Sequence, residues 1–207
     1  LGHPFGPNID GELIPNNLTQ LLEEGSFNNI DLMIGSNKNE DYMYIDENVT
    51  ENDIDKLIER YYPEQKDTLV ALLNLEDPRL AMDHLTTNQV TLCPSVFIAR
   101  SIAKNGNNVY QYHFTRRREG SEKILSYHGA EIPYVFNTHD EWLPTNEDDI
   151  ELTKAMMEYW TEFAKKGTPN SINNPTWKEF GIEENYLILD QTLENSNKLE
   201  NEFCEIM

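Results

Sequence analysis

The 207-residue sequence has no long apolar run, few basic residues and only two cysteines. No run approaches the roughly 20 residues of a membrane-spanning helix, so this segment is not expected to cross a bilayer. Its 16 Lys and Arg residues stand against 37 Asp and Glu residues, which gives a formal net charge of -21. Because such a surface repels phosphate backbones, we expect no nucleic-acid partner. The charge either steers a cationic substrate or simply keeps the protein in solution.

Apolar strands alternate with amphipathic helices along the chain, which predicts an α/β architecture with a mixed, mostly parallel sheet flanked by helices. The stretch up to Pro15 is rich in Gly and Pro and is expected to be irregular. Pro63 should interrupt one helical stretch, and Thr145 or Asn146 should cap the most clearly patterned helix. The expected strands are 31–35, 109–114 and 186–190, and the expected helices are 18–24, 50–75 on both sides of Pro63, 92–103, 146–166 and 199–207.

The five histidines do not form a recognisable metal-binding pattern. His3 and His84 lie in no motif, and His113 lies inside an expected strand. His139 has two acidic neighbours but lacks the spacing of zinc ligands, and it is expected on a polar loop. We therefore expect no metal and no cofactor.

Two short polar segments follow apolar runs, and they carry an acid and a histidine. Residues 36–40 follow Leu32-Met33-Ile34 after Gly35, and residues 126–131 follow the run 109–114 after a loop. α/β-Hydrolases present the last two members of a catalytic triad in this chain order, with each residue in a loop after a strand. The separation of Glu40 and His128 leaves room for one strand–helix–strand excursion between two loops at the same sheet edge.

Several short sequence motifs resemble those of one protein family. Residues 35–41, Gly-Ser-Asn-Lys-Asn-Glu-Asp, resemble the acid loop of type-B carboxylesterases and cholinesterases. Residues 126–136, which contain His-Gly-Ala-Glu-Ile-Pro-Tyr-Val-Phe, are similar to the histidine loop of that family. The Pro-x-x-Asp-Gly opening at 7–15 and the Gly-x-Pro-Asn ending at 167–170 agree. The resemblance covers 1–207 and implies the C-terminal part of a single α/β-hydrolase domain, roughly the last two-fifths of a full family member.

The resemblance implies that Glu40 is the orienting acid and His128 the general base of a serine carboxylesterase acting on a small ester. A neutral imidazole suits proton transfer near neutral pH, and a carboxylate fixes its tautomer and stabilises the imidazolium that forms. Asp41 departs from the family pattern, which usually has glycine after the acid, and it adds a second negative charge near the site.

The nucleophile of such an enzyme is missing from the sequence. It contains neither a Gly-x-Ser-x-Gly word nor a glycine-rich oxyanion loop. We therefore expect the serine on an N-terminal segment or a companion chain of the same esterase, with activity only in its presence. Without that segment the sheet should be incomplete and have an unpaired edge. Leu1 is not an initiator methionine, so any signal peptide is also expected upstream.

Cys93 and Cys204 are either two unrelated buried thiols or a disulfide. The resemblance implies the disulfide, because related enzymes often link a helix that begins with Cys-Pro to a cysteine near the C-terminal helix. A disulfide implies an oxidising compartment, and the sequons at Asn17 and Asn48 indicate glycosylation. We therefore expect a secreted or lumenal glycoprotein.

Two alternatives remain open at this level. A catalytically silent cholinesterase-like protein serving adhesion, storage or assembly would share the same scaffold, although Glu40 and His128 favour the enzyme. The basic run 116–118 is either a solvated loop or a local salt-bridge site. The helix at 147–166 and the C-terminal helix are candidate packing surfaces for an oligomer.

Overall fold

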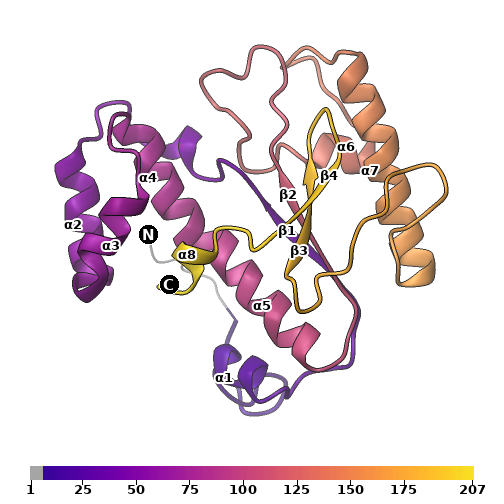
Figure 1. Ribbon diagram of the computed structural model, residues 1–207, viewed down its shortest axis with the longest axis horizontal. Helices are drawn as coiled ribbons and strands as arrows, with labels where there is room; N and C mark the ends of the chain where they lie inside the picture. The colour runs from indigo at the N-terminus through magenta and orange to yellow at the C-terminus, as the bar shows by residue number, and fades with distance from the viewer. Residues whose placement is uncertain (1–6) are drawn as a thin grey trace.

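The computed structural model describes residues 7–207, and a four-stranded sheet forms its centre (Figure 1). The strands lie in the order β1 (Leu32–Asn37), β2 (Val109–Phe114), β3 (Asn185–Leu189) and β4 (Glu194–Asn197). β1, β2 and β3 run parallel, whereas β4 is antiparallel to β3. The sheet is therefore mixed and mostly parallel, as the sequence predicts, with small shifts at the ends of β1 and β3.

The helices begin and end where local signals place them. Thr50 and Asp53 form a capping box at the start of α2, and Pro63 separates α2 from α3. Asn146, not Thr145, caps α7 by accepting a hydrogen bond from the Asp149 backbone N–H at 3.1 Å. None of these helices combines the length and apolar character that a bilayer crossing requires. The helices are α1 (Leu18–Glu23), α2 (Glu51–Tyr61), α3 (Lys66–Leu72), α4 (Pro78–Thr87), α5 (Cys93–Lys104), α6 (Ile132–Phe136), α7 (Glu147–Lys166) and α8 (Asn201–Cys204).

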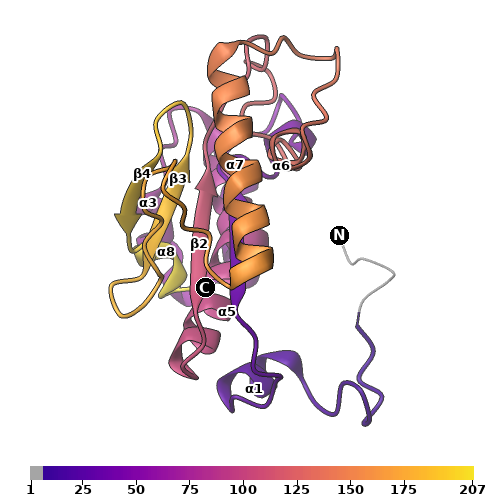
Figure 2. The same cartoon turned by 90° about the vertical axis from the view of Figure 1, so that its right-hand side faces the viewer.

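Helices cover both faces of the sheet. On one face, Ala99 and Ile102 of α5 form an apolar cluster with Val109 of β2. On the other face, Met156 of α7 belongs to a cluster that includes Tyr110, the next residue of β2. Neighbouring residues of a strand point to opposite faces, so β2 contributes alternately to the two layers. Figure 2 shows α7 lying along one side of the sheet.

A third apolar cluster joins α2, α3 and α4 to the C-terminal helix α8, and Tyr186 of β3 also packs against it. Figure 1 shows α2 and α3 away from the sheet. Ile58, Leu69 and Leu85 are buried in the cluster together with Phe203 of α8. α8 is shorter than the helix expected over 199–207. This packing brings the C-terminal segment against the start of α5.

The sequence-based expectation lacks α4, α6, β4 and the π-helical turn η3 (Asn88–Leu92) that joins α4 to α5, as well as two short 3-10 helices, η1 (Tyr42–Tyr44) and η2 (Pro63–Gln65). Pro94 lacks an N–H, so it cannot donate to the carbonyl of Val90 one turn earlier. Loss of this bond favours the wider π turn at the junction. β4 escapes prediction because its sequence, Glu-Asn-Ser-Asn, has no apolar alternation.

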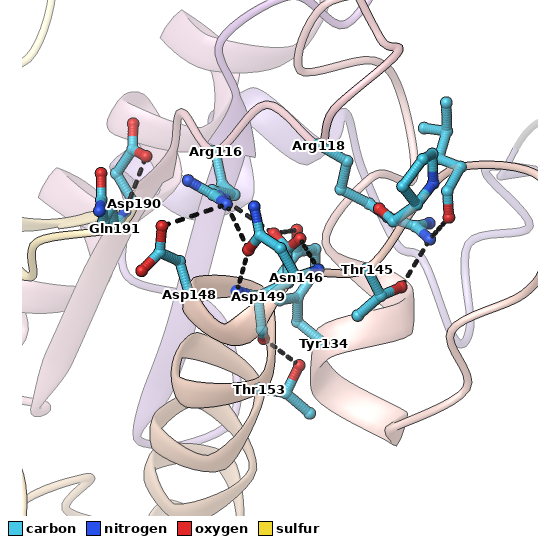
Figure 3. A network of polar contacts seen from close by, with 12 residues as sticks. Arg116, Arg118, Tyr134, Thr145, Asn146, Asp148, Asp149, Thr153, Asp190 and Gln191 are labelled. Carbon is cyan, nitrogen blue, oxygen red and sulfur yellow. Dashed lines mark hydrogen bonds and ion pairs between the residues drawn. The ribbon is translucent and has the colours of Figure 1, made fainter.

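The basic run after β2 is largely buried, and it links the loop that follows β2 to α6 and α7 (Figure 3). Arg116 Nε donates to Asp149 Oδ1 at 2.7 Å, and the Tyr134 hydroxyl donates to the same oxygen at 2.7 Å. Burial alone would raise the pKa of Asp149, but hydrogen bonds from Arg116, Asn146 and Tyr134 hold it below its ordinary value. A solvated loop is therefore the wrong interpretation for Arg116 and Arg118. The salt-bridge alternative holds for both, since Arg118 also forms an ion pair with Asp140 at 3.6 Å.

Candidate active site

The parallel sheet brings the acid loop and the histidine loop to the same edge. β1 ends at Asn37 and β2 at Phe114, and the Lys38 N–H donates to the Phe114 carbonyl at 2.9 Å. The loop after β1 carries Glu40, and the longer segment after β2 carries His128. Because the carboxyl ends of parallel strands lie together, the two side chains meet although they are far apart in sequence.

Glu40 and His128 form a close hydrogen-bonded pair. The distance from His128 Nδ1 to Glu40 Oε2 is 2.7 Å, and the other carboxylate oxygen accepts the Asn37 backbone N–H at 2.7 Å. Glu40 is only 6% exposed, whereas the His128 side chain is 66% exposed. With Nδ1 held by the carboxylate, Nε2 is the nitrogen that can exchange a proton with a nucleophile.

Burial dominates the electrostatics of Glu40. Loss of solvent raises the pKa of its carboxyl above the ordinary value, although hydrogen bonds from Asn37 and His128 oppose this rise. The nearby Glu131 carboxylate raises the pKa further by repulsion. Besides Asp41, which follows the acid in the sequence, Glu131 of the histidine loop therefore adds negative charge near Glu40.

Asn37 links the acid loop to the histidine loop on both sides of His128. Its Nδ2 donates to the Tyr127 carbonyl at 2.8 Å and to Glu131 Oε2 at 2.5 Å. Its backbone N–H holds Glu40, as described above. Asn37 lies in the acid-loop motif and Glu131 in the histidine-loop motif. The sequence alone does not show that the two residues are in contact.

The glycine after the histidine has a conformational reason. Gly129 has φ = +85°, in the left-handed region that side chains rarely adopt. The backbone therefore turns immediately after His128 and leads into α6. This turn leaves the imidazole at the surface next to the buried acid.

The other histidines of the described residues lie apart from this pair. His113 is buried on β2, which lowers its pKa to about 4, so its ring is neutral at pH 7. His84 Nε2 lies 3.0 Å from Glu200 Oε2, and both residues line a cavity of about 340 Å³ together with His113. His139 lies in a loop, as expected, but is partly buried, and its Nε2 lies 2.7 Å from the Thr153 hydroxyl. His3 falls outside the described residues.

No group of three or more His, Cys, Asp or Glu side chains within 7–207 is arranged to hold a metal ion. The structure also describes the two cysteines and the two sequon asparagines. Cys93, at the start of α5, and Cys204, at the end of α8, form a disulfide with a Cα–Cα distance of 5.0 Å. Asn17 and Asn48 are both exposed.

Comparison with known proteins gives the family directly. The model of the carboxylesterase family matches residues 1–207. The chain belongs to the carboxylesterase family. Neuroligin-3 from Mus musculus is 32% identical over 198 residues, which cover 80% of this chain and 24% of that protein. Carboxylesterase 1E from Mus musculus is 29% identical over 224 residues, covering 95% of this chain and 40% of that protein.

Solved structures agree on the fold. A PNB esterase matches 96% of this chain with a TM-score of 0.78 and 22% sequence identity, over 42% of its own length. A thermophilic PNB esterase matches 97% of this chain with a TM-score of 0.79, over 43% of its length. The carboxylesterase chain thus has part of an α/β-hydrolase fold, and it spans less than half the length of these relatives.

Proposed function

We propose that this chain supplies the acid and the base of a serine carboxylester hydrolase, with Glu40 as acid and His128 as base. The observation that carries the proposal is the 2.7 Å contact between His128 Nδ1 and Glu40 Oε2. The carboxylate is buried and accepts a hydrogen bond from the Asn37 N–H, while the imidazole is exposed. This is the arrangement that orients a histidine and leaves its second nitrogen to do proton transfer.

The reaction follows from this geometry. His128 Nε2 takes the proton of a serine hydroxyl as the serine oxygen attacks the ester carbonyl, and it returns the proton to the leaving alcohol. Water then attacks the acyl-enzyme with the same base. Glu40 stabilises the imidazolium in both steps and keeps the Nδ1–H directed away from the substrate.

The serine is proposed to reside on an N-terminal segment or companion chain of the same esterase. The sheet supports this proposal, because β1 pairs only with β2 among the described residues. The open edge of β1 carries Leu32, Met33 and Ile34, an apolar run of the kind that parallel strands have when they are covered on both sides. A further strand along this edge would complete the sheet and bring its own loop to the edge where Glu40 and His128 meet.

A secretory location is proposed from the disulfide and from the two exposed sequons. The Cys93–Cys204 disulfide requires oxidising conditions to form and persist. The sequon asparagines Asn17 and Asn48 are exposed, so both could be reached by a glycosylating enzyme. Mass spectrometry of the secreted protein before and after enzymatic deglycosylation tests this assignment.

The second candidate is a silent relative that serves adhesion, storage or assembly. The similarity to Neuroligin-3 favours this candidate, because the name of that protein states no enzyme activity. The same scaffold can host either function. The intact Glu40–His128 pair favours the enzyme, because a protein without chemistry has no need to bury an acid against an exposed histidine.

Labelling with a fluorophosphonate distinguishes the two functions. In the full-length protein, an activated serine should form a covalent phosphonyl adduct that intact-mass analysis detects. The His128→Ala variant should lose this adduct, whereas His84→Ala, which breaks the His84–Glu200 contact, should keep it. A wild-type protein that forms no adduct and hydrolyses no aryl ester would favour the silent relative.

A further inference from the structure

Asp83 on α4 is a buried carboxylate that accepts hydrogen bonds from the acid loop. It is 1% exposed and accepts three hydrogen bonds. Asn39 Nδ2 donates to Oδ2 at 2.7 Å, and the Asp41 backbone N–H donates to Oδ1 at 3.1 Å. The Thr87 hydroxyl donates to Oδ1 at 3.1 Å. Since Asn39 and Asp41 are the residues on either side of Glu40, α4 fixes the loop both before and after the acid.

Asn39 extends this contact to the histidine loop. Its backbone N–H donates to the Ser126 carbonyl at 3.2 Å, and its Oδ1 accepts the Ser126 N–H at 3.4 Å. Ser126 is fully buried, and its hydroxyl donates to the Thr115 carbonyl at 2.8 Å. Ser126 lies two residues before His128. A continuous chain of hydrogen bonds therefore runs from Asp83 through Asn39 to the segment that carries the histidine.

The donor and acceptor roles in this series of hydrogen bonds are fixed. The amide oxygen of Asn39 faces a donor, the Ser126 N–H, and its amide nitrogen faces an acceptor, the Asp83 carboxylate. Rotating the amide would set two donors against each other at Ser126. The arrangement thus needs an acceptor-only group at position 83 and an amide at position 39, which a packing role alone would not require.

We infer that Asp83 is a positioning residue, which acts through Asn39 to set the separation between the Glu40 loop and the His128 loop. This inference rests on the proposed function, in which these two loops carry the acid and the base. A displacement of about 1 Å at a reacting group can cost on the order of 100-fold in rate. A rigid link from a helix to both loops therefore preserves turnover without touching the substrate.

A polarity swap tests the link in the full-length protein. Asp83→Asn places an amide nitrogen against the Asn39 amide nitrogen, and it should lower kcat by about 10- to 100-fold with KM changed by less than about 3-fold. Combining Asp83→Asn with Asn39→Asp restores every donor–acceptor pair, because the new carboxylate accepts from Ser126 and from the new amide. The double variant should recover kcat to within about 5-fold of the wild type.

A spectroscopic readout separates this inference from the proposed function. The low-field proton signal of the His128 imidazole, whose Nδ1 lies 2.7 Å from Glu40, should broaden or shift in Asp83→Asn and return in the double variant. This result does not depend on ester hydrolysis, so it decides the link even if the wild type turns over no ester. Thr86→Val is the matched control on α4, because the Thr86 hydroxyl donates to the Met82 and Asp83 backbone carbonyls of its own helix.

Should Asp83→Asn fail to fold, Asn39→Ala breaks the same link while leaving Asp83 bound to Asp41 and Thr87. It should lower kcat by about 10-fold and move the His128 signal in the same direction. The inference is overturned if the folded single variants keep the wild-type kcat and His128 signal. It is also overturned if the double variant is as impaired as Asp83→Asn at equal thermal stability.

Discussion

At the scale of single residues, Glu40 combines burial with a negative charge, and the two conflict. Its raised pKa means that the folded state holds a proton more tightly than the unfolded chain does. Stability therefore falls as pH rises from the unfolded value of 4.5 through the higher folded value. The proposed chemistry needs the ionised carboxylate, and ionising Glu40 lowers the stability of the folded state.

Glu40→Gln should consequently stabilise the full-length protein at pH 7 while lowering its activity. The amide can still accept from the Asn37 N–H, and the penalty of a buried charge is gone. The gain should be present at pH 7 and absent well below pH 4.5, where the wild-type carboxyl is protonated in both states. Thermal unfolding of the two proteins at several pH values measures it, and a variant that is less stable than wild type at pH 7 would contradict the account.

Asn37 should matter for turnover more than for binding. Asn37→Ala leaves the Tyr127 carbonyl and the Glu131 carboxylate without their donor. We expect a stability loss of about 1–3 kcal/mol and a fall in kcat of about 10-fold. Asn170→Ala is the matched control, since Asn170 makes two comparable hydrogen bonds to the Trp177 backbone far from the site. Equal kcat in the two variants would show that Asn37 is only structural.

The sequence indicates the roles of Glu40 and His128 because each lies in a specific motif word. It does not indicate those of Asn37, Asp83 and Glu131. Their contacts join residues from different elements, and no local pattern encodes which donor will meet which acceptor. The sequence therefore identifies the residues proposed for the chemistry, but it does not identify the residues whose hydrogen bonds position their loops.

At the scale of elements, the strongest periodic patterns predict best. α2 and α7 have capping boxes and apolar faces, and both lie close to where the sequence places them. α4 is missed because Asp83 and Thr87, polar residues that serve the acid loop, occupy its buried face. The short helix α6 is set by its packing against α7, which only the tertiary structure reveals.

The disulfide should stabilise the apolar cluster that α2, α3 and α4 form with α8. Cys93 and Cys204 are 111 residues apart, so the bond should contribute on the order of 4–5 kcal/mol by restricting the unfolded chain. The double variant Cys93→Ser, Cys204→Ser should lose this stability in denaturant unfolding and show faster amide exchange in α2, α3 and α8. A loss below about 1 kcal/mol would mean that the apolar cluster around Phe203 suffices.

At the scale of the whole molecule, the open edge of β1 is the main liability of the isolated chain. Its unpaired backbone groups can pair with another strand. We expect residues 1–207, expressed alone, to associate despite the net charge of -21. Sedimentation should show oligomers, and co-expression with the N-terminal segment proposed to carry the serine should give a defined complex. A monomeric, cooperatively folded 24.1 kDa species would refute this expectation.

The central claim is that Glu40 and His128 act as the acid and the base of ester hydrolysis. It is tested most directly by kcat/KM for a simple aryl ester, measured in the full-length protein. His128→Ala should lower this value by about 10⁴-fold or more, and Glu40→Gln should lower it by about 10²- to 10⁴-fold, because the imidazole remains. His84→Ala should stay within about 2-fold of the wild type. Near-wild-type activity in His128→Ala would show that His128 is not the base and would overturn the assignment.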